Sequence, residues 1–199
     1  MTKKRNFQPN AYYHVLMRGN NRQNIFNAKT DMLELMRAFL HVHSRFPFRI
    51  LAFCFMTNHY HILIKTEGTS LSKIMGLINK RYSTSYSKRY NHIGRIYQKR
   101  FFAQKVNSPR GLLNVSSYIH RNPIDTKKPM VNHLEQYPYS SYPYYCDESK
   151  PAPPFLDRGV LKYLLPSFYE QTNSSYCQYC LEHKQEVEDD SNSEIIPMK

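Results

Sequence analysis

The order of local patterns in this sequence predicts an α+β fold, in which an antiparallel sheet carries helices on one face. Three observations support the prediction. Four short segments have the apolar or alternating character of strands, two longer segments have the periodicity of amphipathic helices, and the segments follow one another as β-α-β-β-α-β. At 199 residues, the chain is long enough to bury one core and to carry an extension.

The first three elements lie before residue 57. Residues 11–17, AYYHVLM, are rich in β-formers and precede the polar loop RGNNRQN, so they are predicted to form a strand. A helix is expected next, with Thr30 or Asp31 as its N-cap and an apolar stripe on one side. Residues 49–56, RILAFCFM, are almost continuously apolar, as in a central strand. The helical stripe consists of Met32, Leu35, Met36, Phe39 and Leu40.

The next strand places two histidines among apolar residues. Residues 59–65, HYHILIK, alternate between two faces, so His59 and His61 lie on the same side of the strand. The opposite side holds Tyr60, Ile62 and Ile64. If these apolar residues pack under the helices, the histidines point to the other face of the sheet, which we expect to be open for a ligand.

The remaining elements complete the pattern. Ser70 is expected to cap a second helix, and residues 95–106 turn into a fourth strand. Pro109 begins a further helix, which stops before Pro123 because the residue before a proline avoids the α conformation. The first six elements have the order of the ferredoxin-like, split β-α-β fold. The buried stripe of the second helix is expected to be Leu71, Ile74, Met75, Ile78 and Tyr82.

The composition changes near residue 148, where we expect residues 1–148 to form the main domain and 149–199 a C-terminal extension. The extension begins with the stiff sequence KPAPP and ends in the acidic EVEDDSNSE, which is expected to be disordered. No apolar run is long enough to span a membrane, and the basic N-terminus is followed by no apolar segment. We therefore expect a cytoplasmic protein without a membrane partner.

The charge predicts a polyanionic partner. Lys and Arg number 28 against 15 Asp and Glu, for a net charge of +13. The chain also has 17 tyrosines and 11 phenylalanines, which offer faces on which bases can stack. Together these features favour nucleic-acid binding, although charge alone also fits an ordinary protein from a basic proteome.

The four cysteines do not form a recognisable framework. Cys54 lies in an apolar strand and is expected in the core. Cys177 and Cys180 form one CxxC, but a zinc site needs further ligands and no second pair is near. Neither a metal site nor a disulfide framework is expected there, and the role of Cys177 and Cys180 stays open.

His59 and His61 can form a metal site only if a further ligand comes from elsewhere in the chain. Residues i and i+2 of a strand lie roughly 6.5–7 Å apart, so two imidazoles can converge on one ion. In VSSYIHRNPI (115–124), Tyr118 and Asn122 are four residues apart and share one helix face. Asn122 offers an amide oxygen and Tyr118 a phenol, a poor nucleophile until a cation stabilises its phenolate. Histidines at this spacing also occur by chance, and most tyrosines only pack.

Five stretches together make the sequence resemble the single-tyrosine HUH transposases (IS200-like), and more closely the REP-associated tyrosine transposases. They are YYHVLMRGNNRQNIF (12–26), FCFMTNHYHILIK (53–65), GRIYQKRF (94–101), SYIHRNPI (117–124) and YPYSSY (137–142). The resemblance implies the ferredoxin-like fold as well. It further implies that His59 and His61 bind a metal, that Asn122 adds a ligand and that Tyr118 is the nucleophile. Thr57, where proline is common, and Tyr60, in place of valine, are small departures.

This resemblance implies a metal-dependent single-stranded DNA endonuclease and strand transferase. Such a transposase cleaves and rejoins DNA near hairpin, REP-like sequences through a 5′-phosphotyrosine intermediate. The implied cofactor is Mg²⁺ or Mn²⁺, and imidazole ligands favour Mn²⁺. The implied partner is single-stranded DNA with a hairpin, bound by a monomer or a homodimer. The alternative is a catalytically silent, sequence-specific DNA-binding protein derived from a transposase, which would not need His59, His61, Tyr118 or Asn122.

Two segments are expected to contact DNA. Residues 80–102 interleave Lys and Arg with Tyr and Phe, a composition that suits phosphate contacts and base stacking. Its helical part is equally compatible with a solvated basic face. The loop at residues 18–23 offers arginines and asparagines that pair with guanine and adenine edges, or it is a plain turn. The expected DNA-binding residues are Arg18, Asn20, Asn21, Arg22, Arg95, Lys99 and Arg100.

Overall fold

Four antiparallel strands form one sheet in the order β2-β3-β1-β4, as seen in a computed structural model that describes residues 5–184. This order, with both crossover helices on one face, is the predicted ferredoxin-like arrangement. The expected disorder of the acidic end concerns residues that lie mainly in 185–199, outside the described residues. The elements of the sheet domain are β1 (Tyr12–Arg18), α1 (Lys29–His43), β2 (Phe48–Phe55), β3 (His59–Thr66), α2 (Leu71–Tyr90), β4 (Phe102–Val106) and α3 (Pro109–Arg121).

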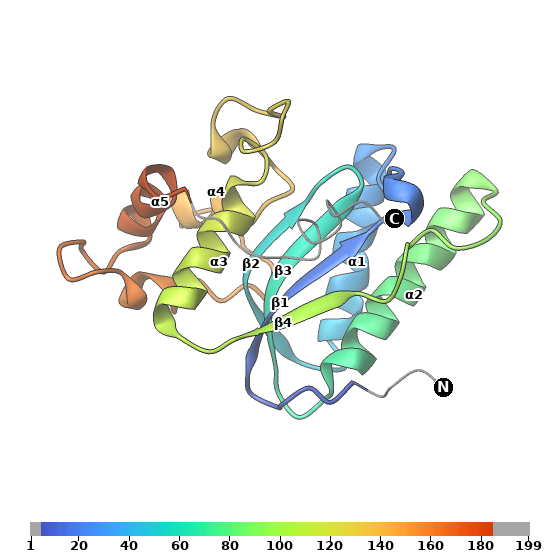
Figure 1. Ribbon diagram of the computed structural model, residues 1–199, viewed down its shortest axis with the longest axis horizontal. Helices are drawn as coiled ribbons and strands as arrows, with labels where there is room; N and C mark the ends of the chain where they lie inside the picture. The colour runs from blue at the N-terminus through green and yellow to red at the C-terminus, as the bar shows by residue number, and fades with distance from the viewer. Residues whose placement is uncertain (1–4, 185–199) are drawn as a thin grey trace, which may run out of the picture.

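Helices α1 and α2 cover one face of the sheet, and α3 lies on the other (Figure 1). The face under α1 and α2 contains the apolar residues of β3, as predicted. Tyr60 is fully buried there, with its ring 6.2 Å from the ring of Phe39 in α1. The predicted stripe of α2 is buried in full. In α1, however, Leu40 is 37 % exposed, whereas Ala38 and Val42 are buried in its place.

Two of the three predicted helix starts, Ser70 as N-cap of α2 and Pro109 as first residue of α3, agree with the structure. Ser70 accepts a hydrogen bond from the backbone N–H of Lys73 at the start of α2, and Ser108 accepts one from Gly111 at the start of α3. The predicted N-cap of α1, Thr30 or Asp31, is wrong, since the cap is Ala28. Asp31 stabilises the helix start from inside the first turn, where its carboxylate accepts the N–H groups of Asn27 and Ala28.

The sheet face opposite α1 and α2 is not open, which corrects the expectation from the sequence. Helix α3 packs against β2 and β3 on this face. Two shorter elements, α4 (Tyr142–Cys146) and α5 (Asn173–Glu182), pack behind α3. His61 is therefore completely buried instead of facing solvent. Only local sequence signals were available for the prediction, and they do not show where a seventh element docks.

Residues after 148 are part of the packed structure in the described region. Phe155 is buried, with its ring 5.8 Å from the rings of Phe39 and Phe48. Residues 155–157 run beside the edge of β2, and the Ile50 N–H donates to the Phe155 carbonyl at 2.8 Å. Residues 139–141 cover the rest of this edge, where the Phe55 N–H donates to Tyr139 at 2.9 Å. Both segments thus complete the hydrogen bonding of β2.

Within residues 5–184, none of the helices has both the length and the apolar character needed to cross a membrane.

Candidate active site

The two histidines of β3 lie on the sheet face that α3 covers. In the antiparallel register, His61 is opposite Leu16 of β1, and His59 is opposite Arg18. Directly paired residues point to the same face, as do residues two apart on one strand. His14 of β1 therefore shares this face with His59 and His61. Three imidazoles thus come from two neighbouring strands.

His61 is held by His14. The Nε2 atom of His14 lies 2.9 Å from Nδ1 of His61, and both rings are fully buried. Burial, with His59, His14 and Arg18 nearby, lowers the pKa of His61 well below its usual value. The ring is therefore neutral, which is the form that binds a metal ion. The contact through Nδ1 fixes the ring orientation and assigns Nε2 as the nitrogen for a ligand.

His59 is oriented by its neighbour Asn58. Nδ1 of His59 lies 2.6 Å from Oδ1 of Asn58, and because an amide oxygen only accepts, Nδ1 carries the proton. In the neutral ring, the lone pair is therefore on Nε2. The amide nitrogen of Asn58 donates to the Arg22 carbonyl at 3.0 Å. Asn58 thereby connects the predicted metal-binding strand to the loop at residues 18–23.

Tyr118 meets the histidines although it is 57 residues beyond His61 in the sequence. Its ring stands almost perpendicular to that of His61, with centroids 5.4 Å apart. The ring of His14 is 5.9 Å away, again edge to face. Tyr118 is half-buried on α3, and its position follows from the packing of that helix on β2 and β3. The fold therefore brings the predicted nucleophile to the predicted ligand pair.

Asn122 lies at the C-cap of α3, one turn beyond Tyr118. Its amide nitrogen donates to the Tyr118 carbonyl at 2.8 Å. This contact ties Asn122 to the tyrosine rather than to the histidines, so its role as a metal ligand stays a prediction.

The donor set is compatible with one divalent ion, provided that oxygen ligands complete it. The ring centroids of His59 and His61 are 5.0 Å apart, and in each ring Nε2 is the nitrogen that a metal ion would bind. Among the described residues, no three His, Cys, Asp or Glu side chains form a metal site. The remaining ligands would have to be oxygens, from Asn122 or from the substrate, which suits Mg²⁺ or Mn²⁺ rather than a closed zinc site.

The predicted DNA-binding segments lie side by side. The Asn20 N–H donates to the Ile96 carbonyl at 2.8 Å, and the Gln98 N–H donates to Arg18 at 3.1 Å. The loop therefore runs against residues 95–100, and both reach the end of β3 that carries His59. Arg18, Lys99 and Arg100 line one small cavity, and Arg95 lines the adjoining groove. Asn21 and Arg22 are exposed, and Asn20 is half-buried.

The sequence did not indicate two residues of the candidate site, His14 and Asn58. His14 is a single histidine in a strand, with no partner at a recognisable spacing. Only the pairing of β1 with β3 shows that it lies beside His61. Asn58 is typical of a turn, and only its position next to His59 could have indicated a role in the site.

The site and the match to a family model together give the class of protein. A phenol stands edge to face against two buried imidazoles on a ferredoxin-like sheet, with cations at the sheet edge. Residues 7–122 match the family model described as "Transposase IS200 like". This match covers more than half of the chain, and the chain belongs to the IS200-like transposase family.

Two relatives refine the comparison. A protein of Haemophilus influenzae, assigned to the REP-associated tyrosine transposases, is 28% identical over 131 residues, which cover 57% of this chain and 70% of that protein. A solved REP-associated tyrosine transposase bound to a REP hairpin superposes with a TM-score of 0.61 at 20% identity. The superposition covers 83% of this chain and 89% of the other, and it shows that the fold is shared.

Proposed function

We propose that this chain is a metal-dependent single-stranded DNA endonuclease and strand transferase. It cleaves and rejoins DNA next to REP-like hairpins through a 5′-phosphotyrosine intermediate. The observation that carries the proposal is the convergence of Tyr118 on His61 and His14, from an element that local sequence does not connect to them. A protein that only binds DNA has no need of a phenol placed over two buried imidazoles.

The chemistry of the phenol balances without an external energy source. The Tyr118 oxygen loses its proton and forms a bond to the phosphorus of a DNA phosphodiester. The bond from phosphorus to the 3′-oxygen breaks, and this oxygen takes up a proton and leaves as a 3′-hydroxyl. One phosphodiester is exchanged for another, so a 3′-hydroxyl reverses the step and rejoins the DNA.

The surrounding residues prepare this step. His14 fixes the ring of His61, and Asn58 fixes that of His59, so both Nε2 atoms keep their lone pairs. The proposed ligands of a Mg²⁺ or Mn²⁺ ion are His59, His61 and Asn122. When bound, such an ion supplies a Lewis acid for the phosphate and for the phenolate.

The proposed substrate follows from the surface and the relatives. The cations of residues 95–100 lie beside Arg18 and Arg22, close to the strand of His59. A basic surface of this kind suits an unpaired DNA strand that must bend towards a buried site. The solved relative was bound to a REP hairpin, and we propose the same class of DNA for this chain.

A covalent-adduct assay tests the proposal. Labelled single-stranded hairpins from the DNA flanking the gene are incubated with Mn²⁺ and the protein, then run on a denaturing protein gel. Wild type is expected to give a shifted band and Tyr118→Phe none. Tyr163→Phe is the matched control, because Tyr163 is 60 % exposed and lies on the C-terminal extension. A band that survives Tyr118→Phe would move the nucleophile to another tyrosine. Hairpin binding without a band from wild type would favour the silent DNA-binding protein.

The same assay tests the metal. Because two imidazoles are softer ligands than carboxylates, Mn²⁺ is expected to give more adduct than Mg²⁺ at equal concentration. Removing divalent ions with EDTA is expected to abolish the adduct and leave hairpin binding in place. Equal or lower adduct with Mn²⁺ in a side-by-side titration would contradict the preference expected from ligand softness.

A further inference from the structure

The C-terminal part of the chain places two thiols against each other. All four cysteines of the chain are free thiols in the structure. Sγ of Cys146, at the end of α4, lies 2.8 Å from Sγ of Cys177 in α5, although the two residues are 31 positions apart in the sequence. A disulfide has a sulfur–sulfur distance of about 2.05 Å, so the two atoms would have to approach by less than about 1 Å. The two thiols therefore have a separation from which a disulfide can form with little movement.

The two thiols differ in exposure and in acidity. Cys146 is exposed, whereas Cys177 is buried. The hydrogen bond with Cys177 lowers the pKa of Cys146, although the partial burial of the sulfur opposes this. The same hydrogen bond, and then burial, raise the pKa of Cys177. Cys146 is thus the thiol that ionises first and meets a dissolved oxidant, and Cys177 is a protonated partner within its reach.

A third cysteine, Cys180, does not turn the pair into a metal site. Over residues 5–184, no group of three His, Cys, Asp or Glu side chains is placed to hold an ion. Cys180 is fully buried in α5, and burial raises the pKa of its thiol to about 12. The arrangement therefore favours a bond between Cys146 and Cys177 over metal binding.

The two elements that carry the thiols support the helix of Tyr118. Helix α4 is anchored to the sheet, since the hydroxyl of Tyr145 donates to the Leu51 carbonyl of β2 at 2.7 Å. Helix α5 contacts α3, where the hydroxyl of Tyr176 lies 3.0 Å from Nδ1 of His120. Figure 1 shows α4 and α5 next to each other, beside α3. A covalent bond between α4 and α5 would therefore tie the support of α3 to the sheet.

We infer that Cys146 and Cys177 form a reversible disulfide when the protein meets hydrogen peroxide, and that this bond fastens α5, and with it α3, to α4. Neither thiol belongs to the histidine site, so the disulfide forms whether or not the chain cleaves DNA.

The oxidation balances in two steps. The Cys146 thiolate attacks one oxygen of the peroxide, the O–O bond breaks, and the leaving oxygen takes up the proton that Cys146 released, which gives a sulfenic acid and water. The sulfur of Cys177 then attacks the sulfur of Cys146, and the hydroxyl leaves as water with the proton of Cys177. The two sulfurs lose two electrons, and the peroxide is reduced to two waters. A dissolved thiol reverses the reaction by attacking the exposed sulfur of Cys146.

Peptide mapping of the full chain tests the bond. The reduced protein is treated with hydrogen peroxide under native conditions, free thiols are blocked with iodoacetamide, and the digest is analysed by mass spectrometry without reduction. The expected product is a peptide pair linked through Cys146 and Cys177, which a thiol reductant separates. Cys146→Ser should give no such link. The matched control is Cys54→Ala, which should keep the link because Cys54 lies in β2. A link through Cys180, a dimer linked through Cys146, or no link in wild type would overturn the inference.

Thermal unfolding and hydrogen exchange test whether the bond fastens α5. Closing a loop of this length restricts the unfolded chain, so the oxidised protein is expected to melt roughly 5–10 °C above the reduced protein. Amide exchange in α5 should also slow on oxidation, because α5 can no longer separate from α4. Cys146→Ser should show the same Tm and the same exchange before and after peroxide. A linked protein with unchanged Tm and unchanged exchange in α5 would contradict the proposed role of the bond.

Discussion

Tyr60, between the two histidines of β3, shows how a polar group is accommodated next to the site. The side chain is fully buried under α1 and α2, and its hydroxyl donates to Oδ1 of Asn79 at 2.6 Å. Burial raises the pKa of Tyr60, so the phenol stays neutral. The sequence marks Tyr60 as an unusual residue at this position, but its partner is 19 residues away on another element.

Removing that hydroxyl is expected to destabilise the protein. Tyr60→Phe leaves the amide of Asn79 buried without this partner, which costs about 1–3 kcal/mol of unfolding free energy. Urea unfolding followed by circular dichroism measures the change. The double variant Tyr60→Phe, Asn79→Leu should recover much of the stability, because both polar groups are then absent. A single variant as stable as wild type would show that the hydrogen bond contributes little.

The sequence predicted which side chains share a face when both residues lie on the same strand or helix. His59 and His61 are two apart on a strand, and Tyr118 and Asn122 are four apart on a helix, so their shared faces follow from local geometry. That the two pairs are involved in one site came from the resemblance, and the structure brings Tyr118 to His61. His14 could not be found in this way, because its role depends on strand register.

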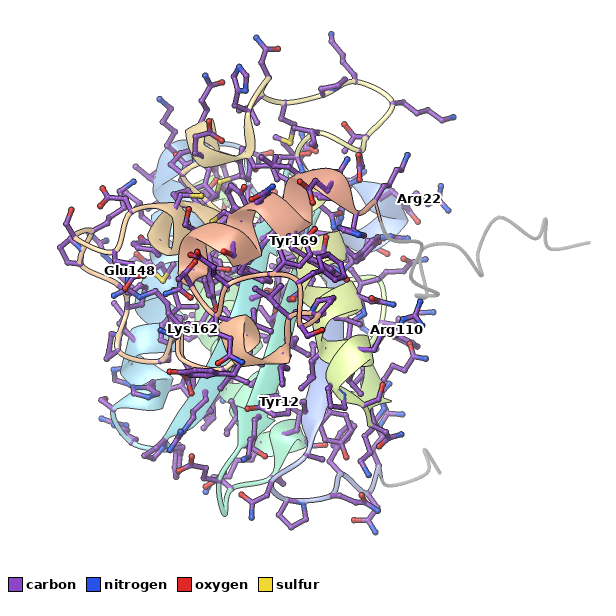
Figure 2. The ribbon with its side chains drawn as sticks, turned by 90° about the vertical axis from the view of Figure 1, so that its left-hand side faces the viewer. Tyr12, Arg22, Arg110, Glu148, Lys162 and Tyr169 are labelled. Atoms are coloured by element: carbon purple, nitrogen blue, oxygen red, sulfur yellow. The ribbon has the colours of Figure 1, made fainter. Side chains whose placement is uncertain are left out.

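At the level of elements, the loop at residues 18–23 is held in a tightly specified shape. A side chain at Gly19 would place its Cβ 2.1 Å from the Gln23 carbonyl oxygen, so no other residue fits without a shift. Asn21 and Arg22 both have positive φ angles, which bulky residues rarely adopt. Hydrogen bonds from Gly19 to Asn58 and from Asn20 to Ile96 fix the loop against both neighbours. Figure 2 shows Arg22 and Arg110 on the same side of the molecule.

This loop is expected to contribute to sequence preference. Replacing Arg18 and Arg22 with Ala should reduce discrimination between cognate and altered flanks, because each bidentate contact to a base is worth about 1–3 kcal/mol. Competition binding with single-base variants of the flank measures this. Uniformly weaker binding with the same preference would mean that both arginines contact only phosphates.

Element boundaries were predicted well, whereas the placement of the last elements was not. Strand patterns, Ser70 and Pro109 are local signals, and each fixed an element within a few residues of its observed limits. The covering of the second sheet face depends on α3, α4 and α5 together. That packing joins segments far apart in the sequence, and no local pattern indicates it.

Across the whole molecule, the helix that carries Tyr118 is supported from behind by α5. Arg121 donates to the carbonyls of Cys180 and Leu181 at 2.9 and 3.0 Å. His120 is fully buried, with Nε2 2.6 Å from Oγ of Ser141 and Nδ1 3.0 Å from the hydroxyl of Tyr176. The nucleophile helix is thus packed between the sheet and a segment far along the chain.

Deleting residues 173–199 should therefore destabilise the sheet domain as well as shorten the chain. Without the buried side chains of α5 and their packing on α3, Tm is expected to fall by roughly 10–20 °C. Deleting only 185–199 is the control, since it leaves helix α5 and its packing on α3 in place. Thermal unfolding followed by circular dichroism, with the adduct assay in parallel, measures both effects. An unchanged Tm for the longer deletion would show that α3 is stable without its support.

The closed edge of β2 also affects how copies of this chain behave at high concentration. An exposed strand edge is a template on which another chain can add a strand, a first step towards aggregation. Residues 139–141 and 155–157 use this edge internally. Among the described strands, β4 keeps an unpaired outer edge, but it is short and contains Lys105. Short length and lysine both disfavour strand addition, so this edge of the sheet also helps to keep molecules apart.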